Sequence, residues 1–123
     1  MTVLIVDDSS IMRTIIKDIL EKFAGLRGVD IHEAADGRDA ISKFSSLKPD
    51  LVFLDISMPD VDGITAVSEM IKINPSANII MCTASSDQID VQNCIAAGAK
   101  EYIIKPPRPE KVMQAFNNIR TPK

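Results

Sequence analysis

Short, nearly continuous apolar runs alternate along the chain with segments whose apolar residues recur at helical spacing. The runs predict five β-strands, at residues 3–6, 29–33, 51–55, 78–83 and 101–104. Most of them fill successive positions with apolar residues instead of alternate ones. That pattern is typical of strands that are covered on both faces of a parallel sheet.

The intervening segments predict helices, because apolar residues return there every three or four positions. Ser9 or Ser10 is placed to cap the first helix, and Pro109 stands near the start of the last. The five apolar faces comprise Met12, Ile15, Ile16 and Ile19; Ala40, Ile41 and Phe44; Ile64, Val67 and Ile71; Val91, Cys94, Ile95 and Gly98; and Val112, Ala115, Phe116 and Ile119. Strict alternation of strands and helices implies right-handed crossovers, so we expect one doubly wound α/β domain over residues 1–123.

The composition is that of an ordinary globular chain. Of its 123 residues, 46% are hydrophobic and 25% are charged, and the net charge is −3. This acidic balance gives no electrostatic support for nucleic-acid binding. No apolar run approaches the roughly 18 residues of a membrane span, and the N-terminus lacks the features of a signal peptide. We therefore expect a cytoplasmic protein without membrane insertion, in which Cys82 and Cys94 are reduced and buried.

Charged and hydroxyl side chains stand where the predicted strands end. Asp7 and Asp8 follow the first strand, Asp55 closes the third, Thr83 ends the fourth, and Lys105 follows the fifth. Because the carboxyl ends of parallel strands meet at one rim of the sheet, we expect these side chains to lie together. Taken singly, each is compatible with a capping or solvated role, and Asp8 is placed to cap the first helix. Their joint arrival at one rim suggests a site for a divalent cation and a phosphoryl group.

The carboxylates of Asp7, Asp8 and Asp55 make a plausible oxygen cage for Mg²⁺. Without a cation, two carboxylates about 5 Å apart repel each other by roughly 3 kcal/mol at an effective dielectric constant near 20. Asp55 is then a candidate nucleophile toward a phosphoryl donor, which would give an aspartyl phosphate. Mg²⁺ and the Lys105 ammonium would stabilise charge on the phosphoryl oxygens, and Thr83 offers them a hydroxyl.

The segments around these residues resemble the receiver domain of two-component response regulators, in the single-domain form used in chemotaxis. The matching segments are Val6-Asp7-Asp8-Ser9, residues 53–63 from Phe53 to Gly63, Cys82-Thr83-Ala84, Ala97-Gly98-Ala99 and residues 102–106 from Tyr102 to Pro106. The resemblance covers nearly the whole chain. It implies a flavodoxin-like (βα)5 fold with strand order 2-1-3-4-5.

The resemblance also implies roles for individual residues. Asp55 would accept a phosphoryl group from a histidine kinase and would ligate Mg²⁺. Asp8 would bind Mg²⁺ directly, Asp7 mainly through water, and Ser57 through its backbone carbonyl. Lys105 would contact the phosphoryl group, and its bond to Pro106 would be cis.

In the same family, Thr83 and Tyr102 would form the switch pair, with Thr83 moving toward the phosphoryl group and Tyr102 turning inward. The output would be a changed surface for protein–protein contact, and Ile89, Lys100, Tyr102 and an outward-facing Met113 outline it. The expected partners are a donor kinase, an output protein such as a flagellar switch component, and a phosphatase.

Alternatives from other classes fit less well. A phosphatase of the haloacid-dehalogenase type would place an acid two residues after Asp55, where this chain has Ser57. A dinucleotide-binding module would need a Gly-x-Gly-x-x-Gly segment after the first strand. Within the receiver interpretation, a phosphotransfer intermediate or phosphate sink and a receiver excised from a larger regulator are the alternatives. In all of these receiver roles the chain would catalyse only its own phosphorylation and dephosphorylation.

Overall fold

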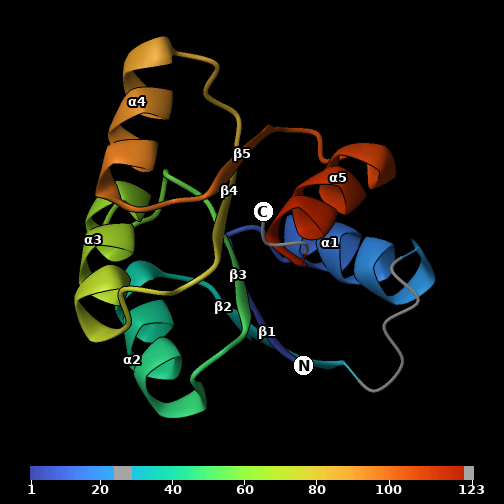
Figure 1. Cartoon of the computed structure of the whole chain (residues 1–123), viewed down its shortest axis with the longest axis horizontal. Helices are drawn as coiled ribbons and strands as arrows, with labels where there is room; N and C mark the ends of the chain where they lie inside the picture. Colours follow the sequence, from blue (N-terminus) through green and yellow to red (C-terminus); the bar gives the residue numbers. More distant parts are fainter. Residues whose placement is uncertain (24–28, 121–123) are drawn as a thin grey trace.

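The computed structural model describes residues 1–23 and 29–120, which form a five-stranded sheet covered by helices on both faces (Figure 1). The strands are β1 (Thr2–Val6), β2 (Asp30–Ala34), β3 (Leu51–Leu54), β4 (Ile79–Thr83) and β5 (Glu101–Ile104). The helices are α1 (Ser10–Phe23), α2 (Gly37–Leu47), α3 (Gly63–Ile73), α4 (Gln88–Ala97) and α5 (Pro109–Arg120). All strand pairs are parallel and the order is β2-β1-β3-β4-β5, so the predicted fold class and strand order are confirmed.

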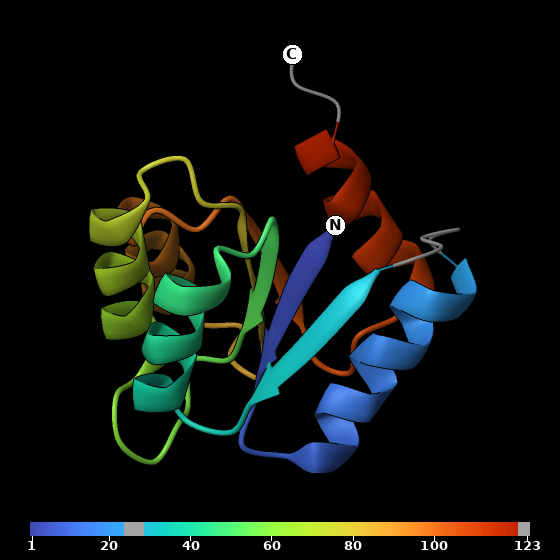
Figure 2. The ribbon, with the colours of Figure 1, turned by 90° about the horizontal axis from the view of Figure 1, so that it is seen from below.

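The sheet separates two apolar layers, with α1 and α5 on one face and α2, α3 and α4 on the other (Figures 1 and 2). Successive residues of β1 alternate between them: Leu4 and Val6 pack under α2 and α3, whereas Val3 and Ile5 pack under α1 and α5. Both faces are covered, which explains why the strand sequences are apolar at nearly every position.

Side-chain caps begin most of the helices. The Ser9 hydroxyl accepts a hydrogen bond from Met12 N at 3.3 Å, so Ser9 rather than Ser10 caps α1. Asp36, Asp62 and Asp87 cap α2, α3 and α4 in the same way. These caps fix the loops that leave the carboxyl ends of the strands.

Two of the predicted apolar helix faces are partly wrong. In α1, Ile15 is 36% exposed and Leu20 is fully buried. In α4, Ile95 is 47% exposed and Cys94 is the buried residue. Helical spacing predicts the direction of an apolar face but not its width, and α4, which packs mainly against α3, has a narrow one.

Cys82 and Cys94 are free thiols in the core, as predicted. Burial raises the pKa of Cys82 to about 12 and that of Cys94 to about 11. Among the helices of residues 1–23 and 29–120, none has the combination of length and apolar character that a membrane span requires.

Candidate functional site: an acidic cluster at the strand ends

The register of β1 and β3 brings the acidic residues together. Val6 and Leu54 are partners across the two strands, and Asp55 N donates a hydrogen bond to Val6 O at 3.2 Å. Each of Asp7, Asp8 and Asp55 offers a carboxylate oxygen, and these three oxygens lie within 4.8 Å of one another. The structure therefore assembles the cluster that the sequence predicts.

The Lys105 ammonium neutralises part of this charge. Its Nζ lies 2.7 Å from Asp7 Oδ2 and 2.9 Å from Asp55 Oδ2. Burial raises the pKa of Asp7, although Lys105 and a hydrogen bond from Ser9 N lower it in part. Burial alone would lower the pKa of Lys105, but the contacts with the two carboxylates outweigh burial and raise it. The lysine therefore stays charged.

The donor set fits a hard divalent cation. Asp7 is 1% exposed, and its Oδ2 accepts no hydrogen bond from the described part of the chain, although it forms the ion pair with Lys105. Asp55 is also buried, whereas Asp8 faces solvent. Three carboxylates beside one ammonium leave two negative charges uncompensated, and oxygen donors suit Mg²⁺-like cations. This cluster could hold such an ion.

A glycine allows α3 to start against the backbone of Asp55. Gly63 N donates to Ile56 O at 2.7 Å. A Cβ on Gly63 would lie 2.1 Å from Asp55 O and 2.6 Å from Ile56 Cα. Within this loop, Ser57 is exposed and its N–H points to Asp55 Oδ1 at 3.4 Å. The loop that follows Asp55 is thus held from the side of α3.

Asp60 fastens the same loop to α2, a role that the sequence analysis missed. Its carboxylate accepts hydrogen bonds from Gly37 N at 2.8 Å and Arg38 N at 3.0 Å. A hydrogen bond from Val61 N, and after it the bonds from Gly37 N and Arg38 N, lower the pKa of Asp60. The sequence shows only an acid in a turn, because the partners lie more than 20 residues earlier in the chain.

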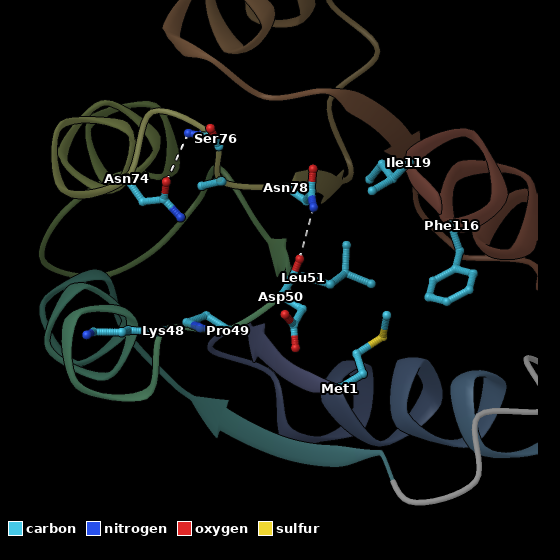
Figure 3. Close-up of a pocket in the computed structure, with 11 residues that line it drawn as sticks. Met1, Lys48, Pro49, Asp50, Leu51, Asn74, Ser76, Asn78, Phe116 and Ile119 are labelled. Atoms are coloured by element: carbon cyan, nitrogen blue, oxygen red, sulfur yellow. Dashed lines mark hydrogen bonds between the residues drawn. The ribbon is translucent and has the colours of Figure 1, made fainter. Parts of the chain in front are cut away.

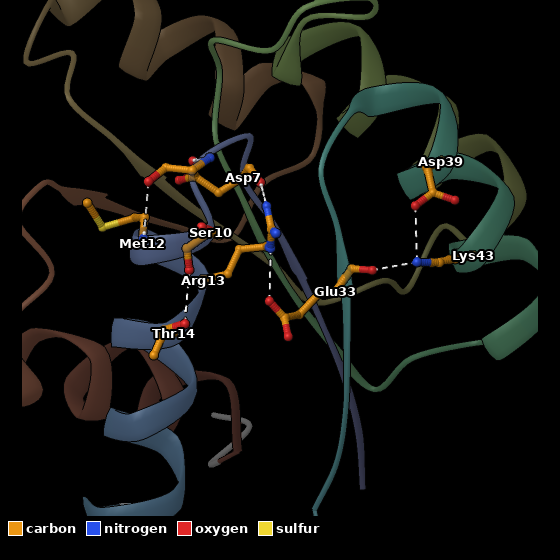
Figure 4. A network of polar contacts seen from close by, with 9 residues as sticks. Asp7, Ser10, Met12, Arg13, Thr14, Glu33, Asp39 and Lys43 are labelled. Atoms are coloured by element: carbon orange, nitrogen blue, oxygen red, sulfur yellow. Dashed lines mark hydrogen bonds and ion pairs between the residues drawn. The ribbon is translucent and has the colours of Figure 1, made fainter.

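A second missed contact holds the end of β1 (Figure 4). Arg13 Nη1 donates to Asp7 O at 2.6 Å, and Arg13 Nε pairs with Glu33 Oε1 at 2.8 Å. Lys43 extends the network from α2 by contacting Glu33 O at 2.5 Å and Asp39 Oδ2 at 3.0 Å. Because the Asp7 carbonyl and carboxylate belong to one residue, this network orients the acidic cluster from the β2 side.

The expected switch pair lies on the opposite side of the cluster. Thr83 is 2% exposed at the end of β4, and its carbonyl accepts a hydrogen bond from Lys105 N at 2.8 Å. Tyr102 is half-buried, and its hydroxyl donates to Ser85 O at 2.8 Å. Burial raises the pKa of Tyr102. The bond between Lys105 and Pro106 is cis, as the resemblance implied.

The expected output surface is only partly as predicted. Ile89 is 65% exposed on α4. Lys100 is exposed, but its Nζ donates to Asn78 Oδ1 at 2.6 Å. The expectation of an outward Met113 is wrong, because Met113 is half-buried against the core under α1 and α5. The sequence did not predict that Ile104 on β5 would be exposed, yet its exposed fraction is 50%.

A hollow of about 580 Å³ lies at the other end of the sheet, between strand starts and helix ends (Figure 3). Several of its polar groups are paired with one another: Asn78 Nδ2 donates to Asp50 O at 3.2 Å, and Asn74 Oδ1 accepts from Ser76 N at 3.0 Å. Asp50 Oδ2 likewise accepts from Thr2 N at 2.8 Å. Among the described residues, the acidic side chains that could together hold a cation lie at the opposite end of the sheet, in the acidic cluster.

Known proteins share this fold and sequence. Residues 3–117 match the family model of the response regulator receiver domain. The chain is 47% identical over 117 residues to the chemotaxis protein CheY of Thermotoga maritima, covering 95% of each chain. It is 46% identical over 116 residues to the chemotaxis protein CheY of Bacillus subtilis, covering 94% of this chain and 93% of that one. A chain in the crystal structure of the CheX–CheY–BeF3–Mg²⁺ complex from Borrelia burgdorferi superimposes with a TM-score of 0.90 at 35% identity, covering 98% of this chain and 90% of that one.

Proposed function

The chain belongs to the response regulator receiver domain family, and from this membership and the acidic cluster beside Lys105 we propose that Asp55 is its phosphorylation site. The chain is a phosphorylation-activated signalling protein of the chemotaxis type, with CheY proteins as relatives over nearly its whole length. The observation that carries the proposal is the convergence of three carboxylates within 4.8 Å of one another, with one ammonium beside two of them.

The chemical step is transfer of a phosphoryl group from a histidine kinase to Asp55. A carboxylate oxygen of Asp55 forms the new P–O bond while the P–N bond to the donor histidine breaks, and the donor nitrogen keeps the electron pair. Asp7, Asp8, Asp55 and the Ser57 carbonyl would hold Mg²⁺, which supplies positive charge against the phosphoryl oxygens when bound. Lys105 stands 2.9 Å from Asp55 Oδ2 and supplies the second positive charge.

The signal then passes through Thr83 and Tyr102. A phosphoryl group adds negative charge and acceptor oxygens at Asp55, which favours the conformer with the Thr83 hydroxyl closer to it. Each tenfold shift between two conformers needs about 1.4 kcal/mol of differential interaction, about that of one good hydrogen bond. Thr83 ends the strand next to the one that carries Tyr102, so the two side chains are placed to move together.

The consequence is a change in protein–protein contacts. We expect the donor to be a histidine kinase and the recipient an output protein such as a flagellar switch component, with a phosphatase as a further partner. Ile89, Lys100 and Tyr102 would form part of the output surface. Residues 1–123 would act as one receiver unit in the cytoplasm, and the only reactions would be the gain and loss of its own phosphoryl group.

The mass of the intact protein after incubation with acetyl phosphate tests this proposal. Wild type should gain one phosphoryl group in the presence of Mg²⁺ and none in its absence. Asp55→Asn should gain nothing, whereas Asp50→Asn should react like wild type, because Asp50 lies at the other end of the sheet, where it accepts from Thr2 N. Phosphorylation of Asp55→Asn to the wild-type level would overturn the assignment.

A further inference from the structure

Helix α4 is weakly anchored by apolar packing. Among its residues, all of which the structure describes, Cys94 alone is buried. Its two isoleucines, Ile89 and Ile95, are 65% and 47% exposed. The polar contacts at the N-terminal end of α4 therefore contribute an unusually large share of what holds this helix in place.

Those contacts meet at Ser85, in the loop between β4 and α4. The Ser85 hydroxyl donates to Asp90 Oδ2 at 2.6 Å and accepts from Asp87 N at 3.2 Å. A serine hydroxyl has a single hydrogen, so its donor capacity is taken up by Asp90. Asp87 meanwhile caps the helix by accepting from Ile89 N at 2.8 Å. The loop and the first turn of α4 thus form one hydrogen-bonded unit.

The same serine receives the side chain of Tyr102. The Tyr102 hydroxyl donates to Ser85 O at 2.8 Å. Ser85 therefore links three elements. It follows β4, two residues after Thr83. Its hydroxyl donates to Asp90 of α4, and its carbonyl accepts from Tyr102 of β5. A rotation of this loop would move the acceptor away from the tyrosine.

From this arrangement we propose that Asp90 is a positioning residue for the switch. By holding the Ser85 hydroxyl, its carboxylate keeps the loop in the form whose Ser85 carbonyl accepts the Tyr102 hydroxyl. Its effect on signalling rests on the proposed function, because Tyr102 is taken there as part of the output. The effect on the position of Tyr102 does not depend on phosphorylation.

The chain offers a direct probe, because Tyr102 is its only tyrosine and it has no tryptophan. Acrylamide quenching of tyrosine fluorescence in the unphosphorylated full chain therefore reports the exposure of Tyr102 alone. Loss of one hydrogen bond of ordinary strength changes the ratio of two conformers about fivefold. Asp90→Ala and Ser85→Ala should each make Tyr102 measurably easier to quench, and the double variant should be no easier to quench than either single one.

Two further variants separate this mechanism from a general effect on helices. Asp90→Asn keeps an oxygen that accepts from Ser85, so its quenching should stay close to that of wild type. Because Asp90→Asn also loses the negative charge in the first turn of α4, it controls for the interaction of Asp90 with the helix dipole. Asp39→Ala removes an acid from the first turn of a different helix, α2, where Asp39 pairs with Lys43. It should leave Tyr102 unchanged.

Unchanged quenching in Ser85→Ala would overturn the proposal, even if Asp90→Ala exposed Tyr102, because Asp90 would then act through α4 and not through the loop. Far-UV circular dichroism identifies a variant that fails to fold. Should Asp90→Ala do so, Ser85→Ala and Asp90→Asn decide the question. Since no phosphodonor is present, a negative result is distinct from a failure of Asp55 to accept phosphate.

Discussion

Replacing Gly63 with alanine should damage the acceptor site through the backbone. The new Cβ would stand 2.1 Å from Asp55 O, 2.6 Å from Ile56 Cα and 2.8 Å from Asp55 C. All three are backbone atoms, so no side-chain rotation relieves the overlap. Ordinary contact begins at about 3.4 Å, so α3 and the Asp55 backbone must separate by roughly 1.3 Å. Such overpacking costs about 1–3 kcal/mol of stability, and a displacement of about 1 Å at a reacting group lowers the rate by roughly 100-fold.

The assay pairs urea unfolding with the rate of mass gain from acetyl phosphate and Mg²⁺, measured where every variant is folded. Gly98→Ala is the matched control. It is also strained, because Gly98 has φ of +126° and its Cβ would meet the Ile71 side chain at 2.5 Å, but it lies after α4 and away from Asp55. Both variants should lose stability, and Gly63→Ala alone should lose phosphorylation. A Gly63→Ala protein that reacts within twofold of wild type would refute the steric argument.

Three other perturbations have defined outcomes. Lys105→Gln leaves the buried carboxylates of Asp7 and Asp55 without their ammonium and should lower the free energy of unfolding by about 3 kcal/mol. In urea titrations, Mg²⁺ should therefore stabilise this variant more than it stabilises wild type. Equal stabilisation of both proteins by Mg²⁺ would contradict the prediction. The pKa of Asp60 is lowered in the folded state, so its stabilising contribution is present above its ordinary pKa of about 3.9 and is lost as pH falls through the lower folded value. In thermal melts, the difference in melting temperature between wild type and Asp60→Asn should thus shrink as the pH falls toward 3. A difference that does not change with pH would contradict this prediction. Cys82 and Cys94, with pKa values raised to about 12 and about 11, should react with a thiol reagent at pH 8 only as fast as the chain opens, and rapid labelling of the native protein would exclude their burial.

The acidic cluster was predictable because strand register converts sequence position into spatial position. Val6 pairs with Leu54, and Thr83 pairs with Ile104, so the residues at and after these positions meet at one edge. The prediction needed only the strand ends and their parallel direction. It did not need the side-chain geometry of any loop.

The contacts of Arg13 and Asp60 were not predictable in the same way. The contact of Arg13 with Glu33 and that of Asp60 with Gly37 join residues 20 or more positions apart, and no local periodicity reports such partners. Met113 was assigned to the wrong environment for a related reason. It directly follows the buried Val112, and only the fit of α5 on the sheet decides how far the buried face of the helix extends.

The two loops that flank Asp55 and Thr83 are held very differently, and this difference has a functional consequence. After Asp55, the loop is fixed by the close approach of Gly63, by the cap at Asp62 and by the bonds from Asp60 to α2. After Thr83, the loop depends on the polar contacts of Ser85, and the helix that follows has one buried side chain. A site that must bind a cation and accept a phosphoryl group requires fixed ligands, whereas a switch requires an element whose two positions differ little in free energy. The chain meets both requirements by placing its rigid loop under the acceptor and its weakly held loop beside Tyr102, so a stabilising change in the second loop should bias the switch without altering the chemistry of the first.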